Sequence, residues 1–452
     1  MKIVIVGDGK IGYTLAQKLS KEGHELVLID NNAAVLQESL ETLDVMTVAG
    51  NGASLEIQRE AGIQNSDLLI AVTGSDEINL LCCILAKKLG CPHTISRSRN
   101  PEYIEQIRFL ADELGLSMTI NPERAAAREI YRLIQFPSFL KRDSFAKGRV
   151  ELVEVKIEEN SPLAGSRLDM LYQTIKVKIL VCSVEREGQI IIPRGEFTLR
   201  VGDKLHVTAP GSELAKLIKN MGITRRQIRD VILIGGSRTA VYLSEDLLHS
   251  GINVKIIEHN QKRCEQLAAV LPEAVIINGD GTRQELLISE GIRETDAVIT
   301  LTDIDEENLI ISMFAEHEHV PKTITKINRT EYSSLFPEQL GSIICPKELT
   351  ANEITRYVRA MVNAEGGSLH TLHRLFDGKA EALEFIAPET SALNSKPLML
   401  LPLRRDILIA SITRRDKVII PSGNDHIEAG DSVVVFTTAD KPIYELEDIL
   451  NH

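Results

Sequence analysis

The sequence predicts an α/β protein with two doubly wound parallel-sheet domains, each followed by a small α+β domain. Two observations carry this prediction: the second half of the chain repeats the first, and within each half short runs rich in Val and Ile alternate with helical patterns. A chain of 452 residues is several times the usual size of one domain, so several cores are expected. Hydrophobic residues make up 43% and charged residues 25%, which is typical of globular proteins.

The repeat pairs similar segments at a nearly constant offset. The matched pairs are Met1–Gly7 with Arg229–Gly235, Glu25–Asp30 with Asn253–Glu258, Gly50–Gly52 with Gly279–Gly281, Thr73–Asn79 with Thr302–Asn308, and Pro193–Asp203 with Pro421–Asp431. Each half therefore contains a larger N-domain and a smaller C-domain. We expect the four domains at residues 1–140, 149–220, 229–365 and 378–452.

The N-domains have the pattern of a Rossmann-like fold. In the first half the apolar runs are 3–6, 26–29, 45–48, 68–72 and 94–96, nearly continuous as in parallel strands buried on both faces. Helical patterns fall between them, for example at Ile11–Lys21 and Glu77–Leu89. A further helix starts near Pro122, and Pro346 starts its counterpart. The C-domains show short strands and turns, and are too small for an independent enzyme core.

The first glycine-rich turn has the pattern of a nucleotide site. Gly7, Gly9 and Gly12 follow an apolar strand and open a helix, and Asp30 ends the next strand. Glycine at these places allows a tight turn and close approach of backbone amides to a pyrophosphate, while the helix N-terminus attracts the anion. Asp30 can accept hydrogen bonds from both ribose hydroxyls of an adenosine, which disfavours the 2′-phosphate of NADP. The alternative is that these glycines only form a turn.

Other residues at the ends of the strands are candidates for the same site. We expect Asn51, after the third strand, beside the adenine edge, and Thr73 and Gly74, after the fourth, along the second ribose or a phosphate. Arg97 and Arg99, at the end of the fifth strand, are candidates for a phosphate or an intersubunit contact. Ordinary salt bridges are the alternative for these two arginines.

The second half keeps the pattern in a degraded form. Its loop reads Gly235-Gly236-Ser237-Arg238-Thr239-Ala240, with Ser and Ala in place of two glycines. Small residues still permit close approach, Glu258 can hold a ribose, and Asp280 and Thr302 lie in the matching loops. We expect nucleotide binding there to be weaker or different.

Composition and charge argue against several classes of function. The net charge of −13 disfavours a partner bound through its nucleic-acid backbone. No apolar run approaches the roughly 20 residues that span a bilayer. The first expected strand begins at Lys2 and leaves no room for a signal peptide, so we expect a cytoplasmic protein. The six cysteines form no Cys-x-x-Cys pair and are expected to be reduced core residues, without a metal site.

No residue pattern predicts catalysis. A dehydrogenase needs a proton donor or acceptor against the nicotinamide, and His93 and Lys88 have no partner at the matching place in the other half. Without chemistry, bound nucleotide can act only by favouring one conformation of an assembly. An NAD-dependent oxidoreductase is the alternative.

Six motifs follow one another along the first half. They are Gly-Asp-Gly-Lys-Ile-Gly at 7–12, Leu-Ile-Asp at 28–30, Gly-Asn-Gly at 50–52, Val-Thr-Gly-Ser-Asp-Glu-x-Asn at 72–79, Arg-Asn-Pro-Glu-Tyr at 99–103 and Ser-Pro-Leu-Ala-Gly at 161–165. In this order, and with the duplication, the whole chain resembles a pair of RCK (KTN) domain units, the regulators of potassium transport.

The resemblance implies a ligand, an assembly and a partner. The ligand would be NAD, NADH or an adenine nucleotide such as ATP or ADP, held by Gly7, Asp8, Gly9, Lys10, Ile11, Asp30, Thr73, Gly74 and Arg97. The small domains would be of the RCK C-type, and the chains would form a tetrameric ring. That ring would lie on the inner face of the membrane under a TrkH-like or TrkG-like potassium transporter. A regulator of a Ktr-type channel or of a cation/proton antiporter is the alternative.

The helix at 123–134 also bears on assembly. Together with Phe136, Phe139 and Leu140 it carries more apolar surface than a small domain easily leaves exposed. We expect a partner subunit to cover it; the alternative is a helix folded back on its own domain.

Overall fold

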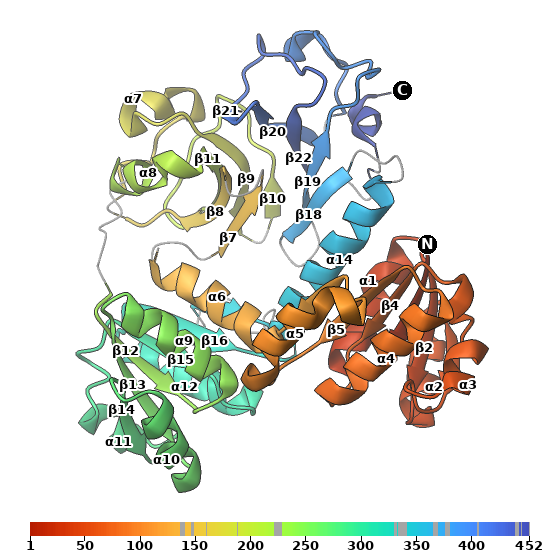
Figure 1. The fold of residues 1–452 in the computed structure, drawn as a ribbon. Helices are drawn as coiled ribbons and strands as arrows, with labels where there is room; N and C mark the ends of the chain where they lie inside the picture. The colour runs from red at the N-terminus through yellow and green to blue at the C-terminus, as the bar shows by residue number, and fades with distance from the viewer. Residues whose placement is uncertain are drawn as a thin grey trace. The chain divides into compact units, whose positions relative to one another are not determined.

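The computed structural model describes residues 1–135, 141–145, 149–159, 161–187, 189–220, 228–329, 332, 341–364, 369–375, 380–404, 406–438, 443 and 445–451. They form two compact units, one of residues 1–131 with 230–355 and the other of residues 132–229 with 356–452 (Figure 1). Among the described residues no helix is both long and apolar enough to cross a membrane.

The first N-domain is a parallel six-stranded sheet in the order β3-β2-β1-β4-β5-β6, as the alternating pattern predicts. Its strands are β1 (Lys2–Val6), β2 (Glu25–Asp30), β3 (Met46–Ala49), β4 (Leu68–Ala71), β5 (His93–Arg97) and β6 (Met118–Ile120). Its helices are α1 (Lys10–Lys21), α2 (Ala33–Thr42), α3 (Leu55–Glu60), α4 (Asp76–Leu89) and α5 (Pro101–Leu114), with the short turn η1 (Ile63–Asn65). Of these strands only β6 was not predicted, because Met118–Ile120 has a central Thr and forms no continuous apolar run.

The second N-domain repeats this sheet in the order β14-β13-β12-β15-β16-β17, and its pairings are again parallel. The strands are β12 (Asp230–Ile234), β13 (Asn253–Glu258), β14 (Val275–Asn278), β15 (Ala297–Thr300), β16 (Lys322–Lys326) and β17 (Ser342–Ile344). The helices are α9 (Arg238–His249), α10 (Gln261–Val270), α11 (Gln284–Ser289) and α12 (Asp305–His317). The fold class predicted from the repeat is therefore confirmed in both halves.

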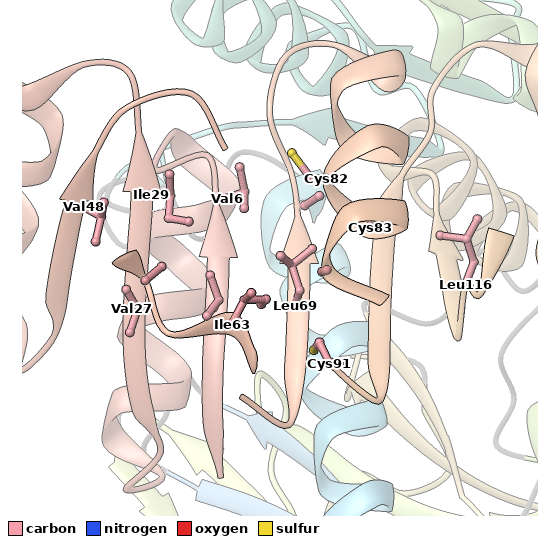
Figure 2. Close-up of a cluster of buried hydrophobic side chains, with 14 of the residues drawn as sticks. Val6, Val27, Ile29, Val48, Ile63, Leu69, Cys82, Cys83, Cys91 and Leu116 are labelled. Carbon is pink, nitrogen blue, oxygen red and sulfur yellow. The ribbon is translucent and has the colours of Figure 1, made fainter. Parts of the chain in front are cut away.

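Residues 3–6 of β1 and Leu68–Ala71 of β4 are apolar and buried, as expected for central strands of a sheet that is covered on both faces. Figure 2 shows part of this core, in which Val27, Ile29 and Leu69 of the strands share one buried cluster with Cys82 and Cys83 of α4. All six cysteines are free thiols, and all but the half-buried Cys345 are buried. Burial raises the pKa of the Cys91 thiol to about 11, which keeps it protonated and unreactive at neutral pH.

One long helix follows each N-domain and packs on the other N-domain of the same chain. Helix α6 (Pro122–Gln135) contacts α9, where Arg124 donates to Asp246 at 3.1 Å and the Tyr131 hydroxyl lies 2.6 Å from that of Ser250. Helix α14 (Pro346–Ala364) contacts α1 through ion pairing of Glu348 with Lys18. The helix at 123–134 thus packs on the second N-domain of the same chain, where duplication supplies a second copy of the fold. Phe136, Phe139 and Leu140 lie outside the described residues.

The C-domains form two antiparallel five-stranded sheets, in the orders β10-β9-β11-β8-β7 and β18-β19-β22-β20-β21. The first contains β7 (Lys141–Phe145), β8 (Val150–Lys156), β9 (Leu180–Arg186), β10 (Gln189–Ile191) and β11 (Lys204–Pro210), with η3 (Leu168–Met170), α7 (Leu171–Ile175), η4 (Gly211–Glu213) and α8 (Leu214–Asn220). The second contains β18 (Leu369–Leu375), β19 (Ala380–Ile386), β20 (Ile407–Arg414), β21 (Lys417–Ile419) and β22 (Ser432–Thr437), with η6 (Leu398–Leu400) and η7 (Leu446–Ile449).

The two C-domains share a core within their compact unit. Phe145 and Cys182 of the first pack in one buried cluster with Ala382 and Phe436 of the second. The Thr208 hydroxyl donates to the Ala410 carbonyl at 3.0 Å across the same contact. The predicted limits of the four domains stay a prediction.

Candidate functional site

A pocket of about 750 Å³ lies at the carboxyl ends of the parallel strands of the first sheet. Ligands bind open α/β sheets at this edge. Part of the pocket wall consists of predicted site residues, namely Gly7, Gly9, Lys10, Ile11, Asp30, Asn51, Thr73, Gly74 and Arg97. Another part comes from the second half of the chain, namely Thr239, Asp303, Lys326, Asn328, Pro346 and Lys347. The sequence patterns did not indicate this second contribution.

The glycine loop needs glycine at its first and last positions. Gly7 has a φ of +99°, and a β-carbon there would lie 2.9 Å from the Thr73 amide nitrogen. A β-carbon on Gly12 would lie only 1.8 Å from the Gly7 carbonyl oxygen. Gly12 therefore lets α1 pack directly on the loop, and it lies behind the pocket wall rather than in it.

Helix α1 begins without a side-chain cap. Its N-cap residue is Gly9, no side chain bonds to this end among the described residues, and the first turn has no acidic residue. Its first amides therefore remain available as donors, and the helix dipole adds positive potential at the same place. This arrangement, with Lys10 beside it, suits a phosphate or pyrophosphate.

Asp30 fixes the loop from the end of β2. Its Oδ2 accepts from the Asp8 amide at 2.8 Å, and its Oδ1 accepts from the Asn32 amide at 2.8 Å. Each carboxylate oxygen has a further lone pair, so Asp30 retains the capacity to accept from ribose hydroxyls. The acid at this position thus both shapes the loop and lines the pocket.

Asp8 is buried behind the loop and does not line the pocket. Its Oδ2 accepts from the Ser39 hydroxyl of α2 at 2.6 Å, and its Oδ1 has no hydrogen-bond partner among the described residues. Burial, together with the nearby Asp30 and Glu38 and opposed by the Ser39 bond, raises the pKa of Asp8 to about 6. Asp8 therefore supports the loop from below.

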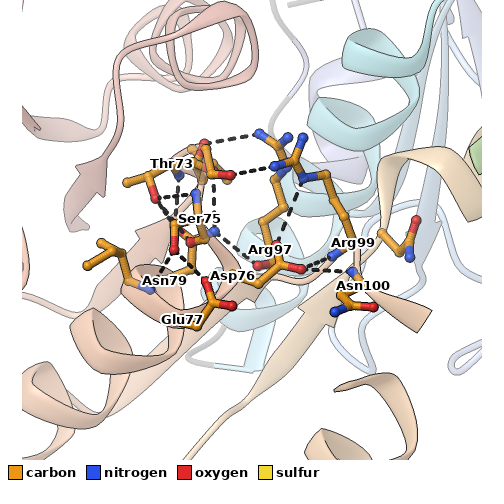
Figure 3. Close-up of polar contacts among 12 residues, drawn as sticks. Thr73, Ser75, Asp76, Glu77, Asn79, Arg97, Arg99 and Asn100 are labelled. Carbon is orange, nitrogen blue, oxygen red and sulfur yellow. Dashed lines mark hydrogen bonds and ion pairs between the residues drawn. The ribbon is translucent and has the colours of Figure 1, made fainter. Parts of the chain in front are cut away.

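A network of polar contacts holds the loop after β4 against the end of β5 (Figure 3). The Asn79 Oδ1 accepts from the Thr73 amide at 2.8 Å and hydroxyl at 2.7 Å, and its Nδ2 donates to the Arg97 carbonyl at 3.0 Å. The Asp76 Oδ2 accepts from the amides of Arg99 and Asn100, both at 2.8 Å. Asn79 and Asp76 were not singled out from the sequence, although both recur in the second half as Asn308 and Asp305.

The two arginines after β5 have different surroundings. Arg97 lines the pocket, donates to the Val72 carbonyl at 3.3 Å, and has a buried Nε without a partner among the described residues. Burial and the neighbouring Arg99 lower its pKa. Arg99 instead donates to the Gly74 carbonyl and lies 3.9 Å from the Asp76 carboxylate. The Nε of Arg99 is likewise buried without a hydrogen-bond partner among the described residues, so what separates the two arginines is that only Arg97 lines the pocket.

The second glycine loop has the same backbone but different surroundings. The Gly235 amide donates to Ile257 at 2.8 Å, as Gly7 does to Ile29, and Glu258 accepts from the Gly236 amide at 2.7 Å. Ser237 caps α9 by accepting from the Ala240 amide at 3.3 Å. The other predicted residues also make local bonds: Asp280 accepts from Thr282, and the Thr302 amide donates to Asn308. None of the predicted second-site residues, Arg238 included, lines the first pocket.

No group of three or more His, Cys, Asp or Glu side chains among the described residues has the geometry of a metal site. The cations and acids of the pocket come instead from separate loops of the two halves. These groups are of the kinds that the sequence predicts for phosphate and ribose.

Family models match most of the chain in the duplicated order. The TrkA-N domain matches residues 3–122 and 231–346, and the TrkA-C domain matches 152–222 and 382–451. The chain is 33% identical to a Trk system potassium uptake protein TrkA homolog of Archaeoglobus fulgidus, covering 99% of this chain and 100% of the relative. It is 32% identical to a Trk system potassium uptake protein TrkA of Halomonas elongata, with 99% and 98% covered.

Solved structures of the same fold include the GsuK RCK domain, with a TM-score of 0.62 and 18% identity over 97% of this chain and 92% of that one. A GsuK channel bound to NAD has the same TM-score and identity, over 97% of this chain and 77% of the other. The near-complete coverage by relatives above 30% identity settles the family. The chain belongs to the family of Trk system potassium uptake proteins TrkA, built from two TrkA-N and TrkA-C pairs.

Proposed function

We propose that this chain is a cytoplasmic regulatory subunit that gates a membrane potassium transporter in response to NAD, NADH or an adenine nucleotide. The observation that carries the proposal is the pocket at the uncapped start of α1, with Asp30 at its ribose end, in a chain of this family. Solved structures of GsuK, which has a similar fold, include one bound to NAD and one bound to ADP. The ligand would bind through Gly9–Ile11 and Asp30.

We further propose that the nucleotide is sensed and not consumed. Among the described residues that line the pocket there is no His, Cys or Tyr. Asp8, whose pKa is about 6, is buried behind the glycine loop. It could reach a nicotinamide ring in the pocket only if the loop moved. Binding energy would then be available for a change of shape.

The route for that change would be the two long helices. Pro122 and Glu123 at the start of α6, and Pro346 and Lys347 at the start of α14, line the nucleotide pocket. Both helices then run from the first compact unit into the second, with the boundary after Tyr131 and after Thr355. A ligand that moves the start of either helix would therefore act on the C-domain that follows it.

We also propose that the chains assemble into a ring, as a tetramer. Helices of both halves bury one face in their own N-domain and expose apolar side chains on the other: Phe109 of α5 is 83% exposed and Ile310 of α12 is 62% exposed. Leu81 of α4 and Met313 of α12 are exposed as well. Exposed apolar surfaces of this kind on both halves favour repeated contacts between copies.

The partner would be an integral membrane potassium transporter of the TrkH or TrkG type, with this chain peripheral on the inner face. The test is to purify the tagged chain from its own cells with gentle solubilisation of membranes and identify what accompanies it. A potassium transporter is expected, with uptake in vesicles that changes when adenine nucleotide is added. Recovery of an antiporter or a Ktr-type channel instead would redirect the proposal to that partner.

The oxidoreductase alternative is tested separately. The purified chain is mixed with NADH and a panel of reducible metabolites, and absorbance at the nicotinamide band is followed. We expect no change beyond the rate of spontaneous oxidation, whereas turnover at enzymatic speed would overturn the sensing proposal.

A further inference from the structure

The duplicated halves present different charges at equivalent places around the first pocket. Glu123 at the start of α6 corresponds to Lys347 at the start of α14, and both line this pocket. Likewise Arg97 at the end of β5 corresponds to Lys326 at the end of β16, and both line it. The site is therefore built from both halves, and only one of its helix starts is acidic.

The cations of the second half are not equally available. The Lys326 ammonium donates to the Thr302 carbonyl at 3.1 Å and pairs with Asp303 at 3.2 Å, so its charge is largely compensated. Lys347 is half-buried and has no hydrogen bond or ion pair among the described residues. Arg97 has its unpartnered Nε. The charged side chains that line the pocket are the cations Lys10, Arg97, Lys326 and Lys347 and the anions Asp30, Glu123 and Asp303, an excess of one positive charge. The Glu123 Oε2 is itself buried without a partner among the residues that the structure describes.

An excess of one positive charge in a partly enclosed pocket favours an anionic ligand group there. The α-phosphate of a nucleotide is already provided for at Gly9–Ile11, where the helix start supplies donors. The additional cations therefore match negative charge further along the ligand. Lys347 also lies at the start of α14, where the helix dipole adds positive potential to that of its ammonium group.

Resting on the proposed function, we propose that Lys347 is a specificity-determining residue of the first site. It selects nucleotides that carry phosphate beyond the α-phosphate, so that nucleoside di- and triphosphates bind in preference to the monophosphate. The second half of the chain thereby contacts the terminal phosphate groups of a ligand whose adenosine is bound by the first half.

The test is calorimetric titration of the full chain with AMP, ADP, ATP and NAD at constant ionic strength. The wild-type chain is expected to bind ADP and ATP more tightly than AMP. Lys347→Gln is expected to weaken ADP and ATP about tenfold, the scale of one charge-assisted hydrogen bond, while AMP changes less than about twofold. Lys262→Gln, at an exposed lysine outside the pocket, is the matched control and should change none of them.

Lys347→Arg keeps the charge and should retain the preference, which separates lost charge from a damaged fold. Equal weakening of AMP and ATP in Lys347→Gln, or an unchanged ATP affinity, would overturn the assignment of Lys347. Equal binding of AMP and ATP by the wild type would do the same while leaving nucleotide sensing intact. Absence of binding for all four ligands would overturn the proposed function itself.

Discussion

The first and second glycine loops share their backbone bonds and differ in what surrounds them. In the first, Asp8 lies under the loop against Ser39, and α1 starts uncapped. In the second, glycine replaces Asp8, and a β-carbon on Gly236 would lie 2.5 Å from Leu267, the counterpart of Ser39. The difference shows that loop shape and ligand capacity are separable, because shape depends on backbone bonds while capacity depends on amides left without a partner.

In the second loop, side chains bond to backbone groups whose counterparts in the first loop have no side-chain partner among the described residues. Ser237 accepts from one amide of α9, that of Ala240, and Arg263 donates to the Gly236 carbonyl at 2.7 Å, where the first half has Val35. Both carboxylate oxygens of Glu258 accept backbone amides, as those of Asp30 do, so these backbone bonds do not distinguish the two loops. The cap gives a physical reason for the weaker or different second site that the sequence indicates, which stays a prediction.

The largest expected effect comes from Gly12→Ala. The new methyl group would lie 1.8 Å from the Gly7 carbonyl, so the helix start must move away from the loop. We expect a loss of about 3 kcal/mol in the free energy of unfolding and loss of nucleotide binding, measured by far-ultraviolet circular dichroism in urea and by calorimetry. The reverse change at the equivalent position, Ala240→Gly, should cost only about 1 kcal/mol of helix propensity. Equal effects at the two positions would show that the loops do not differ in packing.

The next largest effect is a pH dependence of the free energy of unfolding, which Asp8 should cause and which the second loop, with glycine at this position, should not. The folded state raises the pKa of Asp8 from 3.8 to about 6, so it holds this proton more tightly than the unfolded chain does. Stability contributed by the protonated acid is therefore lost as pH rises from about 4 to about 6 and stays lost above that. Asp8→Asn is expected to increase the free energy of unfolding by about 2 kcal/mol at pH 8 and by little at pH 4.

Urea unfolding at the two pH values measures this difference. The same change at the exposed Asp44 is the control and should give a change independent of pH. If Asp8→Asn were equally stabilising at pH 4 and pH 8, the buried carboxylate would not be the cause.

The smallest expected effect tests the helix cap. A β-carbon on Gly9 would have no heavy atom within 4 Å, so Gly9→Ser fits the loop and gives α1 the cap that Ser237 gives α9. We expect the serine to weaken nucleotide binding about threefold relative to Gly9→Ala, which adds the same carbon without the hydroxyl. Equal affinities for the two variants would mean that a free helix end is not what the phosphate needs.

The fold was predictable because the sequence is duplicated, so each weak strand or helix pattern in one half was supported by the same pattern in the other half. Strands and helices of the N-domains followed from continuous apolar runs and helix starts, and Gly7, Asp30 and Arg97 followed from their places after strands. The sequence could not show which side chains turn into the pocket: Asp8 sits between Gly7 and Gly9 yet points behind the loop, towards Ser39, 31 residues away.

The contribution of the second half to the pocket wall could not be predicted from the sequence either. Lys347 and Lys326 reach the first pocket only because the N-domains pack on one another through α6 and α14, and no local pattern encodes that contact. The apolar face of α6 was recognised correctly, but a copy of the fold in the same chain covers it, and amphipathicity alone does not identify the partner.

The most direct test of the account is calorimetric titration of adenine nucleotides into matched acid variants of the two loops. Asp30→Asn and Glu258→Gln each remove one charge and one acceptor from equivalent positions. We predict that Asp30→Asn weakens NAD and ADP binding at least about tenfold while Glu258→Gln changes it less than about twofold. Unchanged binding in Asp30→Asn, or loss in Glu258→Gln alone, would contradict a nucleotide sensor centred on the first loop.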